Sequence, residues 1–169
     1  MLSIFLTKRT DGGAVLKCVR DDGTETWQKQ EGRVAAFFPL HDLTHFSVES
    51  ELGLANAFFG LIEQGWSITD TEGKGPRGPI PTEAQFAEWL VGTLDAERAS
   101  AERWTAEEFN DVGERHFGKA GGSLPRRLTD DDVRRVRKRR AELFEQWAAV
   151  PSGGSLELRF PSATAESHR

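Results

Sequence analysis

The segment from residue 41 to residue 49 holds residue types that bind metals and transfer protons, at a spacing that fits one helix face. Two of the four histidines of the chain, His41 and His45, lie four residues apart. In an α-helix, residues at this spacing lie one turn apart on the same face, with roughly 5–6 Å between their Cβ atoms. Two imidazoles in this arrangement can bind one cation. The spacing therefore indicates a site at which His41 and His45 are metal ligands.

Two carboxylates accompany these histidines. Asp42 follows His41 directly, and in an H-D-x-x-H pattern a carboxylate at this position can act as a base on metal-bound water. Glu49 lies one turn beyond His45 but two turns from His41, about 12 Å along the helix axis. We therefore expect Glu49 to fix the tautomer of His45, and to bind the metal only if the helix bends. If the site is catalytic, Asp42 or Glu49 is the base.

Three interpretations of the segment stay open. The leading prediction is a polar pocket in which His41, His45 and Glu49 bind a small molecule or a group of a partner protein. One alternative is a metal-dependent hydrolase that uses His41 and His45 as ligands of a divalent metal such as zinc. The other is a non-catalytic structural or interaction protein, in which the same side chains form a hydrogen-bonded cluster in the core. No motif in the chain specifies a substrate.

Composition narrows the class of protein. The 169 residues suit one domain, with 37% hydrophobic and 29% charged residues. The net charge of −5 argues against a general nucleic-acid or anionic-membrane binder, because such proteins need a cationic surface. The single cysteine, Cys18, excludes an internal disulfide and fits a reducing compartment. Because the chain shows neither a basic leader nor an apolar run of membrane-spanning length, we expect a cytoplasmic protein.

Apolar periodicity predicts the elements that position the segment. Alternation predicts strands over 2–9, 14–20, 24–28 and 155–160, and helical spacing predicts helices over 41–52, 55–64, 82–102, 105–118 and 129–149. Residues 34–38 are either a further strand or an extended entry to the first helix. The predicted fold class is α+β: a small antiparallel sheet, made of an N-terminal meander and a C-terminal strand, packed on four to five helices. We expect one domain over 1–160 and a flexible polar tail over 161–169.

Local signals refine these helices. Capping boxes predict helix starts at Thr82, with Gln85, and at Thr105, with Glu108. The glycine- and proline-rich segment 69–81 is a loop long enough to lie over a pocket. His116 is expected to be a packing residue before it is a third metal ligand.

The run of basic residues over 134–140 is the one sequence feature that suggests a nucleic-acid contact. Six basic residues stand against five acidic ones between 129 and 149, so the segment as a whole is nearly neutral. Pairs at i,i+4 are typical of a solvated helix face. We therefore expect a solvated face here and no strong nucleic-acid signal.

The block Pro39-Leu40-His41-Asp42-Leu43-Thr44-His45-Phe46 resembles a family of small uncharacterised bacterial proteins, as do Val48-Glu49, Leu52-Gly53-Leu54, Phe58-Phe59-Gly60 and Gly65 after it. Members of that family carry a P-H-D-L-x-H-[FY]-x-V-E block ahead of a helix rich in leucine, glycine and phenylalanine. The likeness is close over residues 39–65, although Leu40 separates the proline from His41. It implies a shared pocket or fold motif and no particular reaction.

The pentapeptide His41-Asp42-Leu43-Thr44-His45 is also similar to the H-E-L-T-H helix of thermolysin-like zinc peptidases. This similarity implies that both histidines bind zinc and that Asp42 replaces the glutamate that activates water. Aspartate is one methylene shorter and needs a backbone shift to reach the same water. The downstream glutamate ligand of that family has no matching context here, since Glu63 lies near the right distance but lacks its partners.

Overall fold

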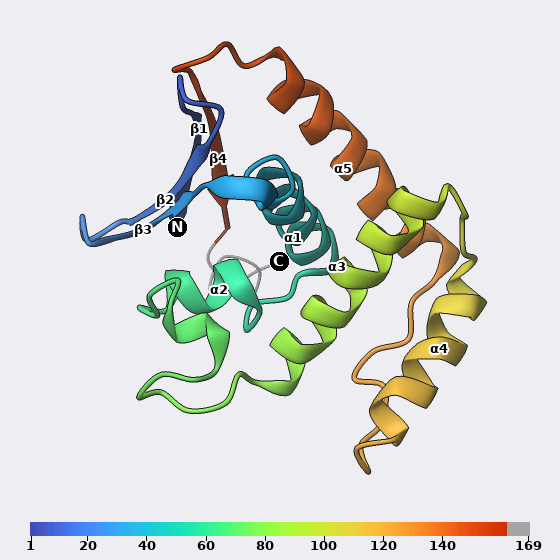
Figure 1. The fold of residues 1–169 in the computed structure, drawn as a ribbon. Coiled ribbons are helices and arrows are strands. Elements are labelled where there is room, and N and C mark those ends of the chain that lie inside the picture. The colour runs from blue at the N-terminus through green and yellow to red at the C-terminus, as the bar shows by residue number, and fades with distance from the viewer. Residues whose placement is uncertain (162–169) are drawn as a thin grey trace, which may run out of the picture.

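The α-helices cover one face of a four-stranded antiparallel sheet (Figure 1). The computed structural model describes residues 1–161. The strands are β1 (Leu2–Lys8), β2 (Ala14–Arg20), β3 (Glu25–Gln30) and β4 (Ser155–Phe160), in the order β3-β2-β1-β4. The predicted α+β class is confirmed, including the return of the last strand to the N-terminal sheet.

Alternation along the strands decides which face of the sheet meets the helices. In β1, Leu2, Ile4 and Leu6 are buried, whereas the residues between them are only partly covered. Ile4 lies opposite Cys18 of β2 and Leu158 of β4, both also buried. A shift of one residue in register would turn this apolar row away from the core, so the pattern fixes the pairing.

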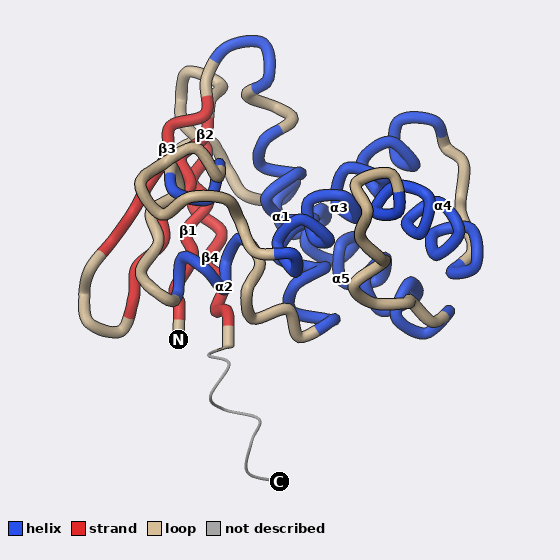
Figure 2. The backbone as a smooth tube through the Cα atoms, turned by 90° about the horizontal axis from the view of Figure 1, so that it is seen from below, coloured by secondary structure: helices blue, strands red, loops and turns tan. Residues whose placement is uncertain are grey.

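Five α-helices follow the first three strands: α1 (Phe38–Leu52), α2 (Phe58–Glu63), α3 (Thr82–Ser100), α4 (Ala106–Gly118) and α5 (Asp130–Ala149). Short 3-10 turns occupy Gly32–Val34 and Asp70–Glu72. Seen from below, the strands lie at one end of the molecule, α3, α4 and α5 at the other, and α1 between them (Figure 2).

The central helix, α1, begins three residues before its predicted start. It already includes Phe38, because Pro39 falls in the first turn, where the missing N–H has no helical partner to lose. Residues 34–38, expected as a strand or an extended entry, instead contain a turn and this helix start. Ten of the fifteen residues of α1 are buried, so the helix has no solvent face of its own. Gly53 ends it in the left-handed conformation, with φ of 66°.

Capping was predicted correctly for one of two helices. Thr105 and Glu108 form the expected capping box at the start of α4. The prediction for Thr82 was wrong: Pro81 occupies the N-cap position of α3, and Thr82 is already helical. Gln85 donates instead from Nε2 to the carbonyl of Ile80, at 3.1 Å. The proline, with its φ fixed near the value that an entering chain needs, starts the helix without a side-chain cap.

Two apolar clusters form the core, and α1 and α5 contribute to both. The first joins α1, α3, α4 and α5; the second lies between the sheet and the helices α1, α2 and α5. Val48 of α1 belongs to the first cluster, and Leu43 and Phe46 belong to the second. The most central helix of the fold is therefore the one that carries the candidate site.

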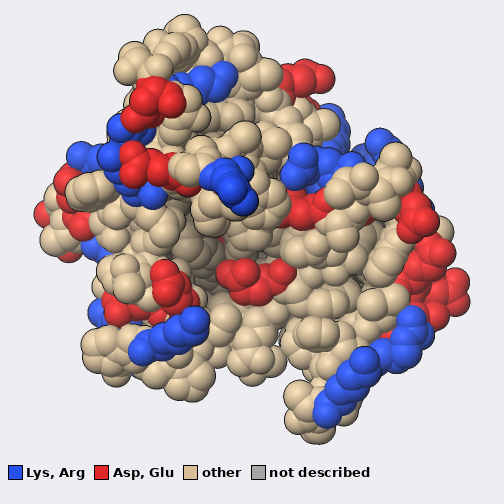
Figure 3. Space-filling model, viewed as in Figure 1, with Lys and Arg blue, Asp and Glu red and all other residues tan. Residues whose placement is uncertain are grey.

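The basic run of α5 is mostly paired within the chain. Arg135 contacts Asp131 at 3.0 Å and Asp132 at 2.8 Å, while Arg137 pairs with the buried Glu97 of α3. On the face drawn in Figure 3, acidic and basic side chains are interspersed. Part of the run is thus not the solvated face that the sequence predicts, because Arg137 joins two helices.

The structure describes the chain as far as residue 161. Of the polar tail predicted over 161–169, residues 162–169 lie outside the described residues. Among the helices of residues 1–161, none combines the length and the apolar character that crossing a membrane requires.

Two glycine substitutions test how tightly α2 packs against the segment that connects it to α1. A Cβ at Gly60 would lie 2.1 Å from the carbonyl oxygen of Ala55, a backbone atom that has no room to move, whereas a Cβ at Gly92 in α3 meets nothing within 4 Å. We expect Gly60→Ala to lower the free energy of unfolding by about 1–3 kcal/mol. Gly92→Ala should raise it by about 0.5–1 kcal/mol. Urea denaturation measures both, and equal effects would contradict the contact at Gly60.

Candidate functional site

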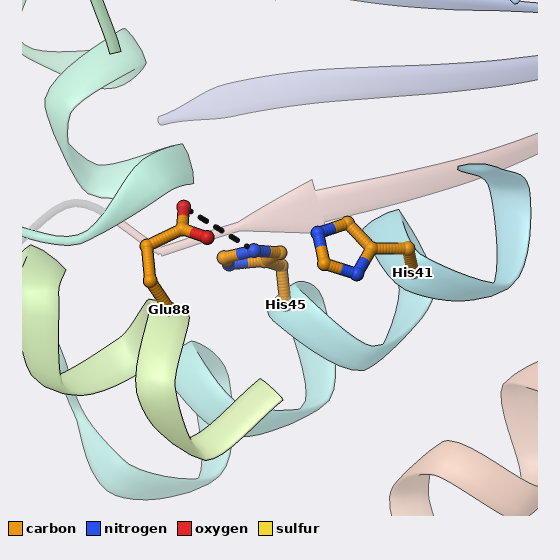
Figure 4. A group of neighbouring side chains, drawn as sticks. All are labelled: His41, His45 and Glu88. Atoms are coloured by element: carbon orange, nitrogen blue, oxygen red, sulfur yellow. Dashed lines mark ion pairs between the residues drawn. The ribbon is translucent and has the colours of Figure 1, made fainter. Parts of the chain in front are cut away.

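Three side chains from two helices converge beside the sheet: His41 and His45 of α1 and Glu88 of α3 (Figure 4). One potential ligand atom from each lies within 4.8 Å of the other two. The two imidazole rings meet edge to face, with 4.9 Å between their centroids. The structure thus brings together the two histidines that the sequence places on one helix face, and adds a carboxylate from elsewhere in the chain.

Glu88 is the member of the cluster that sequence reasoning missed. Its Oε1 lies 3.5 Å from Nε2 of His45, and its side chain is 44% exposed, so it stands at the edge of the site. The contact depends on how α3 packs on α1, and no spacing in the sequence encodes that packing. One signal was available: Glu88 interrupts the apolar run Phe86-Ala87-Glu88-Trp89-Leu90-Val91.

Glu49 lies behind His45, away from Glu88. Its Oε1 lies 3.1 Å from Nδ1 of His45, and its Oε2 accepts hydrogen bonds from the backbone N–H groups of Phe59, at 2.8 Å, and Gly60, at 3.4 Å. The carboxylate is fully buried. The start of α2 therefore stabilises a charge inside the core. In this position Glu49 orients His45 but does not reach the space in front of the rings.

Asp95 does for His41 what Glu49 does for His45. Its Oδ2 lies 2.8 Å from Nδ1 of His41. Its other oxygen, Oδ1, is buried without a hydrogen-bond partner among residues 1–161, and the nearest cation is Arg98, with Nε at 3.9 Å. Asp95 lies two turns after Glu88 on α3, a helix for which the sequence indicated no role in the site.

With both Nδ1 atoms facing carboxylates, the Nε2 atoms are the nitrogens left for a ligand. A carboxylate on the far nitrogen fixes the tautomer and the ring orientation of a metal-binding histidine and raises its basicity. In Figure 4 the outer nitrogen of the His41 ring points toward His45 and Glu88. The site therefore presents two imidazole nitrogens and one carboxylate to a common space.

Asp42 also borders this space. It is buried, and its Oδ2 accepts a hydrogen bond of 2.5 Å from Nε2 of Gln30 on β3. Burial raises the pKa of Asp42 to about 6, against the opposing effects of Gln30 and of the two histidines. The Oε1 of Gln30 is buried without a hydrogen-bond partner in the described part of the chain.

A cavity of about 450 Å³ opens in front of the cluster. Its walls come from every neighbouring element: β3, α1, α2, α3 and the loop between α2 and α3. That loop, predicted to lie over a pocket, supplies Ile68, Thr71, Glu72 and Ile80. Thr26 of β3 holds it in place by accepting a hydrogen bond from the N–H of Ile68, at 3.1 Å. The volume suits a small molecule.

The charges around His45 shift the pKa values of the cluster. Burial opposes the charged imidazole, but Glu49 and Glu88 prevail and raise the pKa of His45 to about 10. Burial raises the pKa of Glu49, although His45 and the N–H groups of Phe59 and Gly60 oppose it. The pKa of Glu88 is lowered despite partial burial, because His45 stabilises its anion. Without a metal, His45 is therefore an imidazolium at neutral pH.

The donor set fits a divalent transition metal. Two imidazoles and one carboxylate are ligands of zinc in hydrolytic enzymes and of iron in the two-histidine, one-carboxylate sites. Ligand atoms of one tetrahedral zinc lie roughly 3.3–3.5 Å apart, and Nε2 of His45 and Oε1 of Glu88 already have this separation. Three protein ligands leave a position open toward the cavity.

Two other reactive residues of the chain lie away from this site. His116 stacks on Trp89 of α3, with 6.2 Å between ring centroids, as expected of a packing residue. Cys18 lies in β2 on the side of the sheet that meets the helices, and burial raises the pKa of its thiol. Neither contributes an atom to the cluster of His41, His45 and Glu88.

Comparisons with known families, with curated proteins and with solved structures found nothing that this chain matches.

The charge on His45 predicts how the stability of the metal-free protein depends on pH. Because the pKa rises from 6.5 to about 10 on folding, the proton on His45 stabilises the fold fully below pH 6.5, and this contribution is lost as the pH approaches 10. We expect the free energy of unfolding, measured with urea in the presence of a chelator, to fall across this range. In His45→Gln the fall should be clearly smaller. His116→Gln is the control and should keep the wild-type slope; identical slopes in all three proteins would contradict the charged pair.

Proposed function

We propose that the protein is a divalent-metal protein, with zinc as the expected ion, that hydrolyses a small molecule bound in the cavity beside α1. One observation carries this proposal: two imidazoles and a carboxylate meet within 4.8 Å at a cavity wall, with a second carboxylate behind each imidazole. Structural zinc sites have four protein ligands, whereas catalytic sites have three and an open position. The donor count favours the catalytic type.

The electrostatic balance of the cluster also favours a cation. Glu49, Glu88 and Asp95 each contact one of the two histidines, and Asp42 lies beside them. Four carboxylates therefore stand beside two imidazoles, and ionised carboxylates would leave an excess of negative charge even if both rings were protonated. A dication bound by His41, His45 and Glu88 would displace the proton of His45 and would still offset part of this negative charge.

Each residue then has a distinct role in hydrolysis. A metal held by His41, His45 and Glu88 would supply a Lewis acid that lowers the pKa of a water molecule. Asp42, which lines the same cavity, is placed to accept the proton of an attacking water, the role that its neighbour His41 cannot take as a ligand. Glu49 and Asp95 are positioning residues, which orient the two rings from behind.

The third ligand in this proposal comes from a different part of the chain than the similarity to the thermolysin-like peptidases implies. The similarity of His41-Asp42-Leu43-Thr44-His45 implies a glutamate further along the chain as the third ligand, and Glu63 was the candidate by distance. Glu63 ion-pairs at 3.2 Å with the amino group of Met1, whereas Glu88 is the carboxylate that lies with the two histidines. The proposal therefore depends on the cluster itself. The likeness to the small bacterial proteins, the cytoplasmic location and the absence of a nucleic-acid partner stay predictions of the sequence.

A second candidate function is purely structural. His45 is paired on both ring nitrogens, with Glu49 at 3.1 Å and Glu88 at 3.5 Å. This favours a buried imidazolium that ties α1 to α3 without any metal. The two candidate functions differ in the expected response to zinc, because only the metal protein binds Zn²⁺.

Titration with Zn²⁺ tests the proposal. We expect the untagged, chelator-treated protein to take up about one equivalent of Zn²⁺, measured by calorimetry and by metal analysis after gel filtration. His45→Ala should abolish this uptake, and Glu88→Gln should weaken it more than about tenfold, because each removes one of three ligands.

Matched controls remove residues of the same types outside the site. His116→Ala and Glu107→Gln, both on α4, should bind Zn²⁺ like the wild type. Wild-type protein that takes up no Zn²⁺, or His45→Ala protein that takes up as much as wild type, would contradict the metal site. If His45→Ala then only lowers the melting temperature, this result would support the purely structural function.

The role of Asp95 can be separated from that of the ligands. Asp95→Asn keeps the shape of the side chain but removes the negative charge behind His41, so we expect Zn²⁺ to bind about 10–100-fold more weakly. Asp111→Asn, at an exposed position of α4, is the control and should change the affinity little. An unchanged affinity in Asp95→Asn, with a changed melting temperature, would show that Asp95 serves packing only.

A further inference from the structure

The cavity in front of the cluster combines two kinds of wall. Apolar side chains form one part, from Phe38 and Phe58 on the helices to Ile68 and Ile80 on the loop. Carboxylates form the other: Asp42, Glu72 and Glu88. No lysine or arginine is among the described residues that line this cavity. Apart from the two histidines, the ionisable side chains of the wall are therefore acidic, and they stand beside apolar surface.

A bound dication does not reverse the sign of this cavity. Behind the rings lie two more carboxylates, Glu49 and Asp95, so five acidic side chains either line the cavity or contact its histidines. The one guanidinium that contacts this set, Arg98, lies 3.9 Å from Asp95 and does not line the cavity. Low-dielectric walls that carry one sign of charge focus the potential in a cleft. The cavity therefore attracts cations and repels anions even when the metal is bound.

Glu72 is the carboxylate placed to select a ligand. It ends the 3-10 turn Asp70–Glu72 in the loop over the cavity, and it is exposed. Its carboxylate makes no hydrogen bond or ion pair with residues 1–161, whereas Asp42 is bonded to Gln30 and Glu88 is paired with His45. It is therefore the cavity acid whose charge is not already compensated by a neighbour.

The aromatic rings add to the same preference. Phe58 lies with its ring 5.3 Å from that of His45, at the inner end of the cavity. The face of a phenyl ring carries negative electrostatic potential and attracts an organic cation more strongly than an anion. Together with Phe38, it provides the apolar surface that a ring or a branched chain would cover.

From these features we infer the substrate class: a small apolar amine that carries a hydrolysable carbonyl group, with its ammonium on Glu72, its apolar body against the phenylalanines and its carbonyl oxygen toward the metal. The same acidic walls disfavour phosphate esters and carboxylate-bearing substrates. This assignment rests on the proposed metal-dependent hydrolysis.

Two benzohydroxamates with para substituents of opposite charge test the inference on Co²⁺-loaded protein. The probes are 4-(aminomethyl)benzohydroxamate, a cation, and 4-carboxybenzohydroxamate, an anion, and the visible absorption of the bound Co²⁺ reports their binding. We expect the cation to bind about tenfold more tightly or better, as one partly exposed charge pair allows. Glu72→Gln should reduce this ratio at least about threefold. Glu107→Gln, an exposed acid of α4 outside the cavity, should leave it unchanged.

The outcomes separate the two levels of the proposal. If the wild type takes up no Co²⁺ and no Zn²⁺, the metal function and the substrate class both fall. If Co²⁺ binds but the anionic probe binds as tightly as the cationic one, the metal site stands and the substrate class is overturned. A preference for the cation that Glu72→Gln leaves unchanged would contradict the assignment of the ammonium to Glu72.

Discussion

The carboxylate of Glu49, held inside the core by His45 and by two backbone N–H groups, is the interaction on which the rest of the structure depends. An ionised carboxylate away from water is costly unless it is paired and fully hydrogen-bonded. Phe59 and Gly60 supply the N–H groups, so α2 must begin beside α1. Gly60 allows α2 to pack against the segment that connects it to α1, because a Cβ there would lie 2.1 Å from the carbonyl oxygen of Ala55. One buried charge thus fixes the position of two helices and of an imidazole.

Carboxylates of α3 also pair with the histidines of α1. Glu88 and Asp95 lie on one face of α3, and each faces a different histidine of α1. Between the helices the polar groups form a row that runs from Glu49 through His45 and Glu88 to His41 and Asp95, next to an apolar cluster that contains Val48, Leu90 and Leu94. The apolar contacts hold the helices together, and the polar row fixes their rotation, because either helix must keep its carboxylates opposite the imidazoles.

The sequence predicted what depends on local periodicity and could not predict what depends on packing between distant elements. Alternation in β1 and the spacing of His41 and His45 were sufficient for the sheet and for one face of α1, because strand and helix periods are properties of the local chain. Glu88 and Asp95 come from a helix whose rotation is set by its contacts with α1, and no local rule supplies that rotation. Two errors arose at prolines. The helix that contains Pro39 in its first turn begins earlier than predicted, and Pro81 occupies the N-cap position that was predicted for Thr82.

The composition of the polar row is itself an argument about function. Replacing buried ion pairs by well-packed apolar side chains is often neutral or stabilising, so stability alone does not call for this arrangement. The row also contains more carboxylates than imidazoles, and Oδ1 of Asp95 and Oε1 of Gln30 are left without hydrogen bonds among the described residues. Such a cluster is a costly way to join two helices. The cation proposed for the space where His41, His45 and Glu88 meet would bind these three groups and offset part of the negative charge around them.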